Sequence, residues 1–174
     1  MESGFSYHDL GRIAYADALT RQTAAFDALL QAKAAGVQGE NQLFFCEHDP
    51  VLTIGKSGKE TNLLIPEASL RERGVSFYHI NRGGDITYHG PGQITGYPVF
   101  DLAYWSLGLR PYIKLLEEVV IRFLALYGLR GERLAGATGV WLDPFVPSRA
   151  RKMCEIGVNC SRFVYMRGFG LNSY

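Results

Sequence analysis

The chain has 174 residues, of which 47% are hydrophobic and 20% charged, and its formal net charge is +1. This length and composition predict a single domain with a real hydrophobic core and exclude a disordered chain. The near-neutral charge gives no general electrostatic reason to expect nucleic acid or an anionic membrane as a partner.

The amino terminus and the cysteines indicate where the protein works. No basic segment followed by an apolar run opens the chain, and no apolar stretch reaches the length of a membrane span. The three cysteines, Cys46, Cys154 and Cys160, form no Cys-x-x-Cys pair and leave an odd thiol in any pairing scheme. Because disulfide frameworks use even numbers of cysteines in oxidising compartments, we expect a cytoplasmic protein.

Three segments have helical patterns. Apolar residues recur at helical spacing after Tyr15, and Gly36 follows as a stop signal. Pro111 stands where the first position of another amphipathic helix would be. The expected helices are 15–35, 66–73 and 111–127.

Strand patterns outnumber helices. The expected strands are 43–46, 51–54, 75–80, 85–89, 94–102, 139–142, 152–159 and 163–166. Several of their connections are too short for helical crossovers, which favours a mixed, largely antiparallel sheet with helices packed on one face. The predicted fold class is therefore α+β rather than a doubly wound sheet.

Two glycine-rich stretches could bind ligands. Gly55-Lys-Ser57 invites a phosphate-loop interpretation, but Pro50 stands where that motif needs its first glycine, so the interpretation fails. What remains is a solvated basic loop or a ligand site of another kind.

The second stretch is Arg82-Gly-Gly-Asp-Ile-Thr-Tyr-His-Gly-Pro-Gly-Gln93. Its glycines let backbone N–H groups approach a ligand closely, and its hydroxyl, imidazole and amide groups suit a carbonyl-bearing ligand. The alternative is a pair of tight β-turns whose side chains satisfy only their own backbone.

Lys152 and Cys154 are the remaining candidates. They are two residues apart on an expected strand, so both side chains would point to the same side as a lysine–thiolate pair. A buried lysine has a lowered pKa and can trade protons. The alternatives are a strand-end lysine in water and a cysteine that only packs, as we expect of Cys46 and Cys160.

Several motifs together resemble the octanoyltransferase family, also called lipoyl(octanoyl) transferase or lipoate–protein ligase B. The match covers most of the chain, and the long segment from Arg82 to Gln93 is its most specific part. The other matching motifs are Glu47-His-Asp-Pro-Val-Leu-Thr-Ile-Gly55, Tyr97-Pro98, Gly136-Ala-Thr-Gly-Val-Trp141, Lys152-Met-Cys-Glu-Ile-Gly-Val158 and Gly168-Phe-Gly-Leu-Asn172.

The resemblance implies the fold of biotin and lipoate ligase catalytic domains and an acyltransferase of protein lipoylation. Such an enzyme moves an octanoyl group from octanoyl-acyl carrier protein, through an acyl-cysteine, to a lysine of apo lipoyl domains. These acceptors belong to 2-oxoacid dehydrogenases and the glycine cleavage H protein. We expect no metal or other cofactor and no nucleic-acid or membrane partner, because the thioester supplies the driving force.

The resemblance also assigns roles to residues. Lys152 matches the catalytic lysine. The substrate contacts carried over by motif are Arg82, Gly83, Gly84, Asp85, Ile86, Thr87, Tyr88 and His89, then Glu155, Ile156 and Gly157, and finally Gly168, Phe169 and Gly170.

The chain departs from the family pattern at three places. The family has histidine where Arg167 stands and alanine where Gly170 stands. Its nucleophilic cysteine lies in an Asn-Pro-Cys-Gly segment beyond the Leu-Asn motif, and no such segment occurs up to Tyr174. We therefore expect residues 1–174 to be a single catalytic domain that lacks the family's C-terminal segment.

Two other functions fit a protein with these features. One is an ATP-dependent lipoate- or biotin-type protein ligase on the same fold, although its arginine- and glycine-rich signature is not found here. The other is a non-catalytic module that binds acyl carriers or lipoyl domains, which would need no nucleophile.

Overall fold

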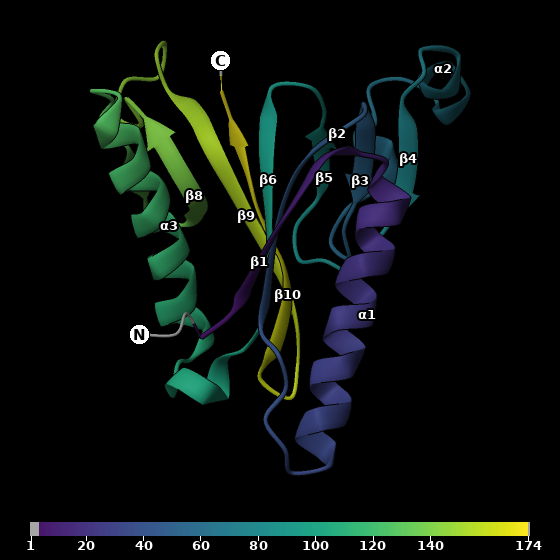
Figure 1. Cartoon of the computed structure of the whole chain (residues 1–174). Helices are drawn as coiled ribbons and strands as arrows, with labels where there is room; N and C mark the ends of the chain where they lie inside the picture. Colours follow the sequence, from purple (N-terminus) through teal and green to yellow (C-terminus); the bar gives the residue numbers. More distant parts are fainter. Residues whose placement is uncertain (1–3, 174) are drawn as a thin grey trace.

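Two separate sheets organise the computed structural model, which describes residues 4–173 (Figure 1). The large sheet has the strand order β1-β2-β6-β10-β9-β8-β7 and the small one β4-β3-β5. The large sheet comprises β1 (Ser6–Ile13), β2 (Gln42–His48), β6 (Gln93–Asp101), β7 (Glu132–Leu134), β8 (Ala137–Leu142), β9 (Arg151–Ser161) and β10 (Val164–Asn172). The small sheet comprises β3 (Val51–Ile54), β4 (Ser76–His79) and β5 (Ile86–His89).

The sheets are mixed but mostly antiparallel, which confirms the predicted α+β class. Only the β1–β2 and β3–β4 pairs run parallel among the described strands. The pairs β2–β6, β6–β10, β10–β9, β9–β8, β8–β7 and β3–β5 are antiparallel.

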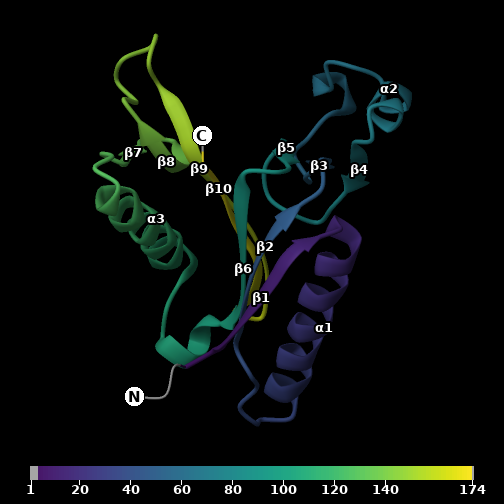
Figure 2. The same cartoon turned by 45° about the horizontal axis from the view of Figure 1, so that its top comes forward.

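Helices α1 (Tyr15–Ala34) and α3 (Leu109–Leu126) lie on opposite faces of the large sheet, so the expectation of helices on one face was wrong (Figure 2). In β10, Val164 and Met166 belong to the core under α1, whereas Tyr165 packs in the core with Tyr112 of α3. Successive strand residues point to opposite faces, so a strand apolar at consecutive positions needs a cover on both sides.

Shorter elements complete the chain. The α2 helix spans Glu67–Glu72, and two 3₁₀ turns span Glu60–Asn62 and Leu102–Trp105. None of the helices within residues 4–173 is long and apolar enough to cross a membrane.

Strands β1 and β7 were not predicted from the sequence. β1 lies at the edge of the large sheet, where most of its residues are half-buried or exposed, and Gly11 bends it at φ 58°. An edge strand buries too little surface to need a strong apolar alternation. β10 also runs farther than expected, to Asn172. The prediction ended it too early because the glycines in its second half lack the β-branched and aromatic side chains typical of strands, although this half is paired with β9.

Candidate functional site

A cleft of about 1190 Å³ lies over the large sheet between α3 and the small sheet. β9 and β10 form its floor, the connection from β4 into β5 forms one wall, and α3 with the β7–β8 turn forms the other. Figure 2 shows α3 with β7 and β8 on one side of β10 and the small sheet on the other. Distant parts of the chain therefore meet at one concave surface.

Arg82 holds the glycine-rich wall in shape. Its Nη1 donates to the carbonyl oxygen of Gly83 at 2.8 Å, and its Nη2 donates to that of Asp85 at 2.9 Å and lies 3.3 Å from Oγ1 of Thr53. Its aliphatic part crosses to β9, where a Cβ added to Gly157 would lie 2.9 Å from Cδ of Arg82. The guanidinium thus fixes the backbone of the turn, and Gly157 leaves room for it.

Hydrogen bonds link His89 to the backbone of Lys152. His89 Nδ1 lies 2.6 Å from Oε1 of Gln93, Gln93 Nε2 donates to Oδ1 of Asn172 at 3.0 Å, and Asn172 Nδ2 donates to the carbonyl oxygen of Lys152 at 3.2 Å. An amide oxygen only accepts, so Nδ1 carries the proton and Nε2 keeps its lone pair. Burial lowers the pKa of His89 to about 4, so the imidazole is neutral at pH 7.

Lys152 lies at the solvent side of the cleft. Its side chain is exposed, its Nζ lies 5.6 Å from the ring centre of Trp141, and a Cβ on Gly139 would lie 2.9 Å from its Cε. The environment is that of a strand-end lysine in contact with water, and the residue still lines the cleft.

A bulge in β9 separates Cys154 from Lys152. β8 pairs Val140 with Cys154 but Trp141 with Lys152, so β9 carries one extra residue between them. Cys154 is fully buried in the core that includes Leu124 of α3, and burial raises its pKa to about 12. The hypothesis of a Cys154–Lys152 pair is wrong. The packing role is confirmed for the buried Cys154 and Cys46, whereas the expectation of packing at Cys160 was wrong, because that residue is exposed.

Glu155 is a carboxylate held inside the cleft. Thr87 Oγ1 donates to its Oε2 at 3.1 Å, which joins β5 to β9. Burial raises the pKa of Glu155, and the positive charges of Arg82 and Lys152 work against that rise. The small sheet is thereby tied to the floor of the cleft by a polar contact.

All the residues predicted to contact substrate line the cleft except Tyr88. Thr87 and His89 point inward from β5, and the alternation of the strand turns Tyr88 between them outward, where its side chain is half exposed and packs on Gly90. Lys152 lines the same cleft. The motif residues 82–89, 155–157 and 168–170 therefore converge from three strands and one loop.

Sequence reasoning missed the other wall. It assigned no ligand contact to α3, whose lining residues carry no motif, nor to the β7–β8 turn, although the matching motif Gly136–Trp141 begins there. The additional lining residues are Tyr15, Ile80, Thr95, Tyr97, Leu109, Arg110, Ile113, Lys114, Glu117, Arg133, Leu134, Ala135, Gly136, Ala137, Thr138, Val158 and Arg167.

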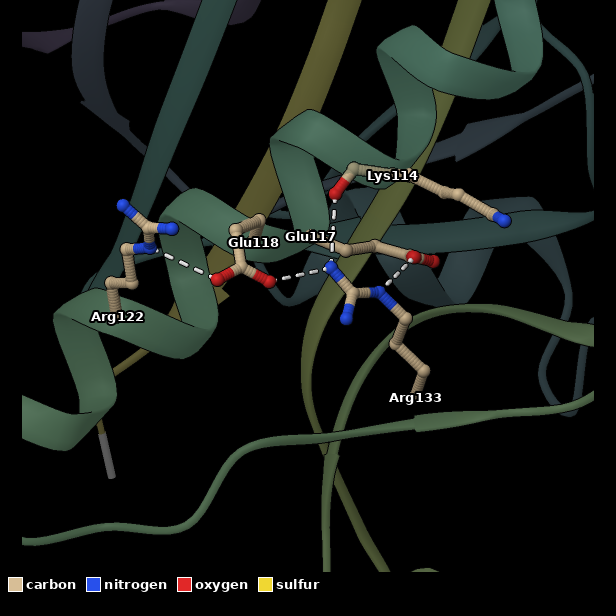
Figure 3. Close-up of polar contacts among 5 residues, drawn as sticks. All are labelled: Lys114, Glu117, Glu118, Arg122 and Arg133. Atoms are coloured by element: carbon tan, nitrogen blue, oxygen red, sulfur yellow. Dashed lines mark hydrogen bonds and ion pairs between the residues drawn. The ribbon is translucent and has the colours of Figure 1, made fainter.

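An ion-pair network fixes that wall (Figure 3). Arg133 Nε donates to Oε2 of Glu117 at 2.9 Å, and Arg133 Nη2 donates to Oε2 of Glu118 at 2.9 Å and to the carbonyl oxygen of Lys114 at 3.1 Å. Glu117 also accepts the backbone N–H of Gly139 at 3.1 Å. Because Glu117 is buried, removing Arg133 would leave its carboxylate without its ionic partner, so the β7–β8 hairpin and α3 depend on each other here.

Comparisons with known proteins agree with this architecture. The family model described as the lipoyl protein ligase A/B catalytic domain matches residues 7–173. An octanoyltransferase of Parabacteroides distasonis is 78% identical over 172 residues, which are 99% of this chain and 77% of that protein. An octanoyltransferase of Porphyromonas gingivalis is 55% identical over 170 residues, 98% of this chain but 35% of that protein.

Solved structures share the fold at low identity. The bipartite lipoate protein ligase of Thermoplasma acidophilum, studied with its E2 lipoyl domain, superimposes with a TM-score of 0.69 and 16% identity. The match covers 98% of this chain and 62% of that one. With the family model and the two relatives, this places the chain in the lipoyl protein ligase A/B catalytic-domain family, among its octanoyltransferases, which are acyltransferase enzymes.

Proposed function

We propose that the protein transfers an octanoyl group from octanoyl-acyl carrier protein to a lysine of apo lipoyl domains in the cytoplasm. The observation that carries the proposal is the convergence of Lys152 with the segment from Arg82 to His89 on one cleft. The relatives are named octanoyltransferases, which supports octanoyl as the transferred group. A lipoate protein ligase of the same fold was solved with its E2 lipoyl domain, which supports lipoyl domains as acceptors.

The chemistry proceeds through two acyl transfers. A cysteine thiolate attacks the thioester carbonyl carbon, the bond from that carbon to the carrier's sulfur breaks, and the carrier leaves as a thiol after taking a proton. The acceptor lysine's amine then attacks the acyl-enzyme. An amide forms, the amine loses a proton, and the enzyme's thiolate is released.

Lys152 supplies charge and protons to both steps. Its ammonium stabilises the attacking thiolate and gives the proton that the departing carrier thiolate needs; its neutral form then accepts the proton of the attacking amine. Backbone N–H groups of the glycine-rich wall supply donors for the oxyanion, each worth roughly 3 kcal/mol of barrier in such sites.

We propose that the nucleophile is none of the three cysteines Cys46, Cys154 and Cys160. Cys46 and Cys154 are buried, and burial raises the pKa of each to about 12; Cys160 is exposed but does not line the cleft. We therefore assign the nucleophile to the family's cysteine-bearing segment, which follows the Leu-Asn motif at the end of β10.

Intact-mass measurement tests the proposal. The full-length protein, including the cysteine-bearing segment, is mixed with octanoyl carrier protein, and one octanoyl adduct is expected. An apo lipoyl domain then removes the adduct and gains the octanoyl group itself. Residues 1–174 alone serve as the matched control and gain no adduct.

The same assay separates the rival functions. Labelling of the lipoyl domain from free octanoate and ATP, without carrier thioester, would identify a ligase. Complex formation with a lipoyl domain but no adduct on the full-length protein would identify a binding module. Either result would overturn the proposed acyl-cysteine route.

A further inference from the structure

The side chain of Lys152 is exposed, and yet two residues of β8 lie against it. A Cβ added to Gly139 would lie 2.9 Å from Cε of Lys152, and Nζ of Lys152 lies 5.6 Å from the ring centre of Trp141. Lysine is among the side chains with the most rotamer freedom, so an exposed one has no fixed position by itself. The contacts with β8 therefore restrict where the ammonium lies in the cleft.

The backbone of β8 approaches Lys152 closely because residue 139 is a glycine. Its φ is 122°, which residues with a Cβ rarely adopt, and an added Cβ would also clash with the carbonyl oxygen of Cys154. The bulge of β9 lies at the same level, between Cys154 and Lys152. A glycine next to a bulge has more conformational freedom than a regular strand residue, so its position depends on the contacts around it.

Glu117 of α3 supplies such a contact. Its Oε1 accepts the backbone N–H of Gly139 at 3.1 Å. Its Oε2 accepts Nε of Arg133 at 2.9 Å, and Arg133 is bound in turn to two other groups of α3 (Figure 3). Glu117 is only 7% exposed, so water competes little for either oxygen. Both oxygens are therefore engaged, which fixes the orientation of the carboxylate toward Gly139.

The helix that carries Glu117 is itself packed on β8. Val120 and Leu124 of α3 lie in one core with Val140 of β8 and with Cys154. Glu117 precedes Val120 by about one helical turn, so it lies where this core meets the cleft. The packing sets the distance between α3 and β8, and the hydrogen bond from Gly139 then fixes the backbone on which Lys152 lies.

We infer that Glu117 is a positioning residue for acyl transfer: through the N–H of Gly139 it holds the part of β8 that directs the ammonium of Lys152 into the cleft. The inference rests on the proposed function and assigns a part of it to α3, which carries no motif. In the alternative, Glu117 only ties the β7–β8 hairpin to α3, and its loss lowers stability without moving Lys152.

Three variants of the full-length protein separate these roles. Glu117→Leu removes the acceptor of the Gly139 N–H. Glu117→Gln keeps an amide oxygen for that N–H but loses the ion pair with Arg133, whose side chain is 41% exposed and can turn to water. Glu118→Gln is the matched control, because Glu118 accepts from the same arginine and does not line the cleft.

NMR spectroscopy measures the position of Lys152 without any acyl donor. We expect a nuclear Overhauser effect between the α protons of Gly139 and the ε protons of Lys152 in the wild-type protein, Glu117→Gln and Glu118→Gln. It should be lost in Glu117→Leu, in a protein that keeps its fold by circular dichroism. Should Glu117→Leu not fold, Glu117→Met replaces it, since an unbranched methionine adapts to the same space.

The rate of octanoyl adduct formation measures the consequence for the reaction. Glu117→Leu should lower the rate at saturating octanoyl carrier protein by about 10–10²-fold, the effect of a misplacement of about 1 Å, and leave the half-saturating carrier concentration unchanged. Glu117→Gln and Glu118→Gln should stay within about threefold of the wild-type rate.

The outcomes separate the inference from the proposed function. A retained Overhauser effect or a wild-type rate in Glu117→Leu overturns the inference and leaves the proposed function standing. Losses in Glu117→Gln as large as in Glu117→Leu also overturn it, because the ion pair with Arg133 would then matter rather than the bond to Gly139. If the wild-type protein forms no adduct, the proposed function fails and the inference fails with it.

Discussion

Thr87 and Glu155 are hydrogen-bonded at 3.1 Å across the cleft, although they are 68 residues apart in the chain. The bond connects the small sheet to the large one at the level of the glycine-rich wall. Since Glu155 is otherwise desolvated, the hydroxyl of Thr87 does more for the relative position of the two sheets than a surface contact could.

Thr87→Val should therefore destabilise the protein by about 1–3 kcal/mol, because it leaves a half-buried carboxyl with one fewer donor at nearly unchanged side-chain volume. Urea denaturation at neutral pH measures the change. Thr61→Val, at an exposed threonine, is the control and should stay within about 0.5 kcal/mol of wild type. Equal effects of the two substitutions would show that the Thr87–Glu155 bond contributes nothing.

His89 should make stability fall on mild acidification. Its folded pKa is about 4, below the unfolded value of about 6.5, so between these values the unfolded chain binds the proton and the folded protein does not. The stability is present above about pH 6.5 and is lost, by on the order of 3 kcal/mol, as pH falls to about 4. Buried His48, whose pKa burial also lowers, acts in the same direction.

The pH dependence is checked by urea denaturation of wild type and His89→Gln across that window. The substitution should flatten the acid loss of stability, whereas His79→Gln, at an exposed histidine, should not. Glu155 has a raised pKa, so it acts oppositely: its contribution is present at low pH and is lost as pH rises through its folded pKa. An acid loss as steep in His89→Gln as in wild type would contradict a neutral buried imidazole.

Lys152→Met should reduce acyl transfer by about 10²–10⁴-fold, the usual range for a positioned acid–base group. The melting temperature should hardly change, because the side chain is exposed. Lys152→Arg should not restore the rate, since a guanidinium does not trade protons near neutral pH. The measurement is the rate of octanoyl adduct formation by mass, with Lys59→Met as the exposed control. Near-wild-type rates in Lys152→Met would remove this lysine from the mechanism.

The two glycines flanking Phe169 should respond differently to alanine. At Gly168 the added Cβ would clash with the backbone carbonyl oxygen of Gly96, whereas at Gly170 it would lie 2.8 Å from the side-chain Oε1 of Gln93. A side chain can shift more cheaply than a paired strand, so Gly168→Ala should cost about 2 kcal/mol or more. Gly170→Ala should cost about 1 kcal/mol or less. Chemical denaturation of both variants tests the order, and the reverse ranking would refute this account of β10.

Much of the fold was predictable because local patterns are strong where burial is strong. The long helices show their periodicity around Tyr15 and after Pro111, and both are present within two residues of the expected starts. The edge strand β1 and the short β7 were missed because their half-exposed residues need no apolar alternation. Which face of the sheet each helix covers depends on which β10 side chains it packs against. Because β10 is buried on both faces, its sequence has no alternation that would distinguish one face from the other.

The candidate site was predictable only where a motif carries it. The sequence by itself predicted the α+β class, and its motifs named the segment from Arg82 to His89 and Lys152 as candidates, which with the exception of Tyr88 line one cleft. Only the tertiary structure decided that Cys154 is separated from Lys152 by a bulge, that α3 lines the cleft, and that Nε and Nη1 of Arg167 are buried without a hydrogen-bond partner among the described residues. These relationships arise from register and packing between strands that are distant in sequence, and such contacts leave no trace in local composition or spacing.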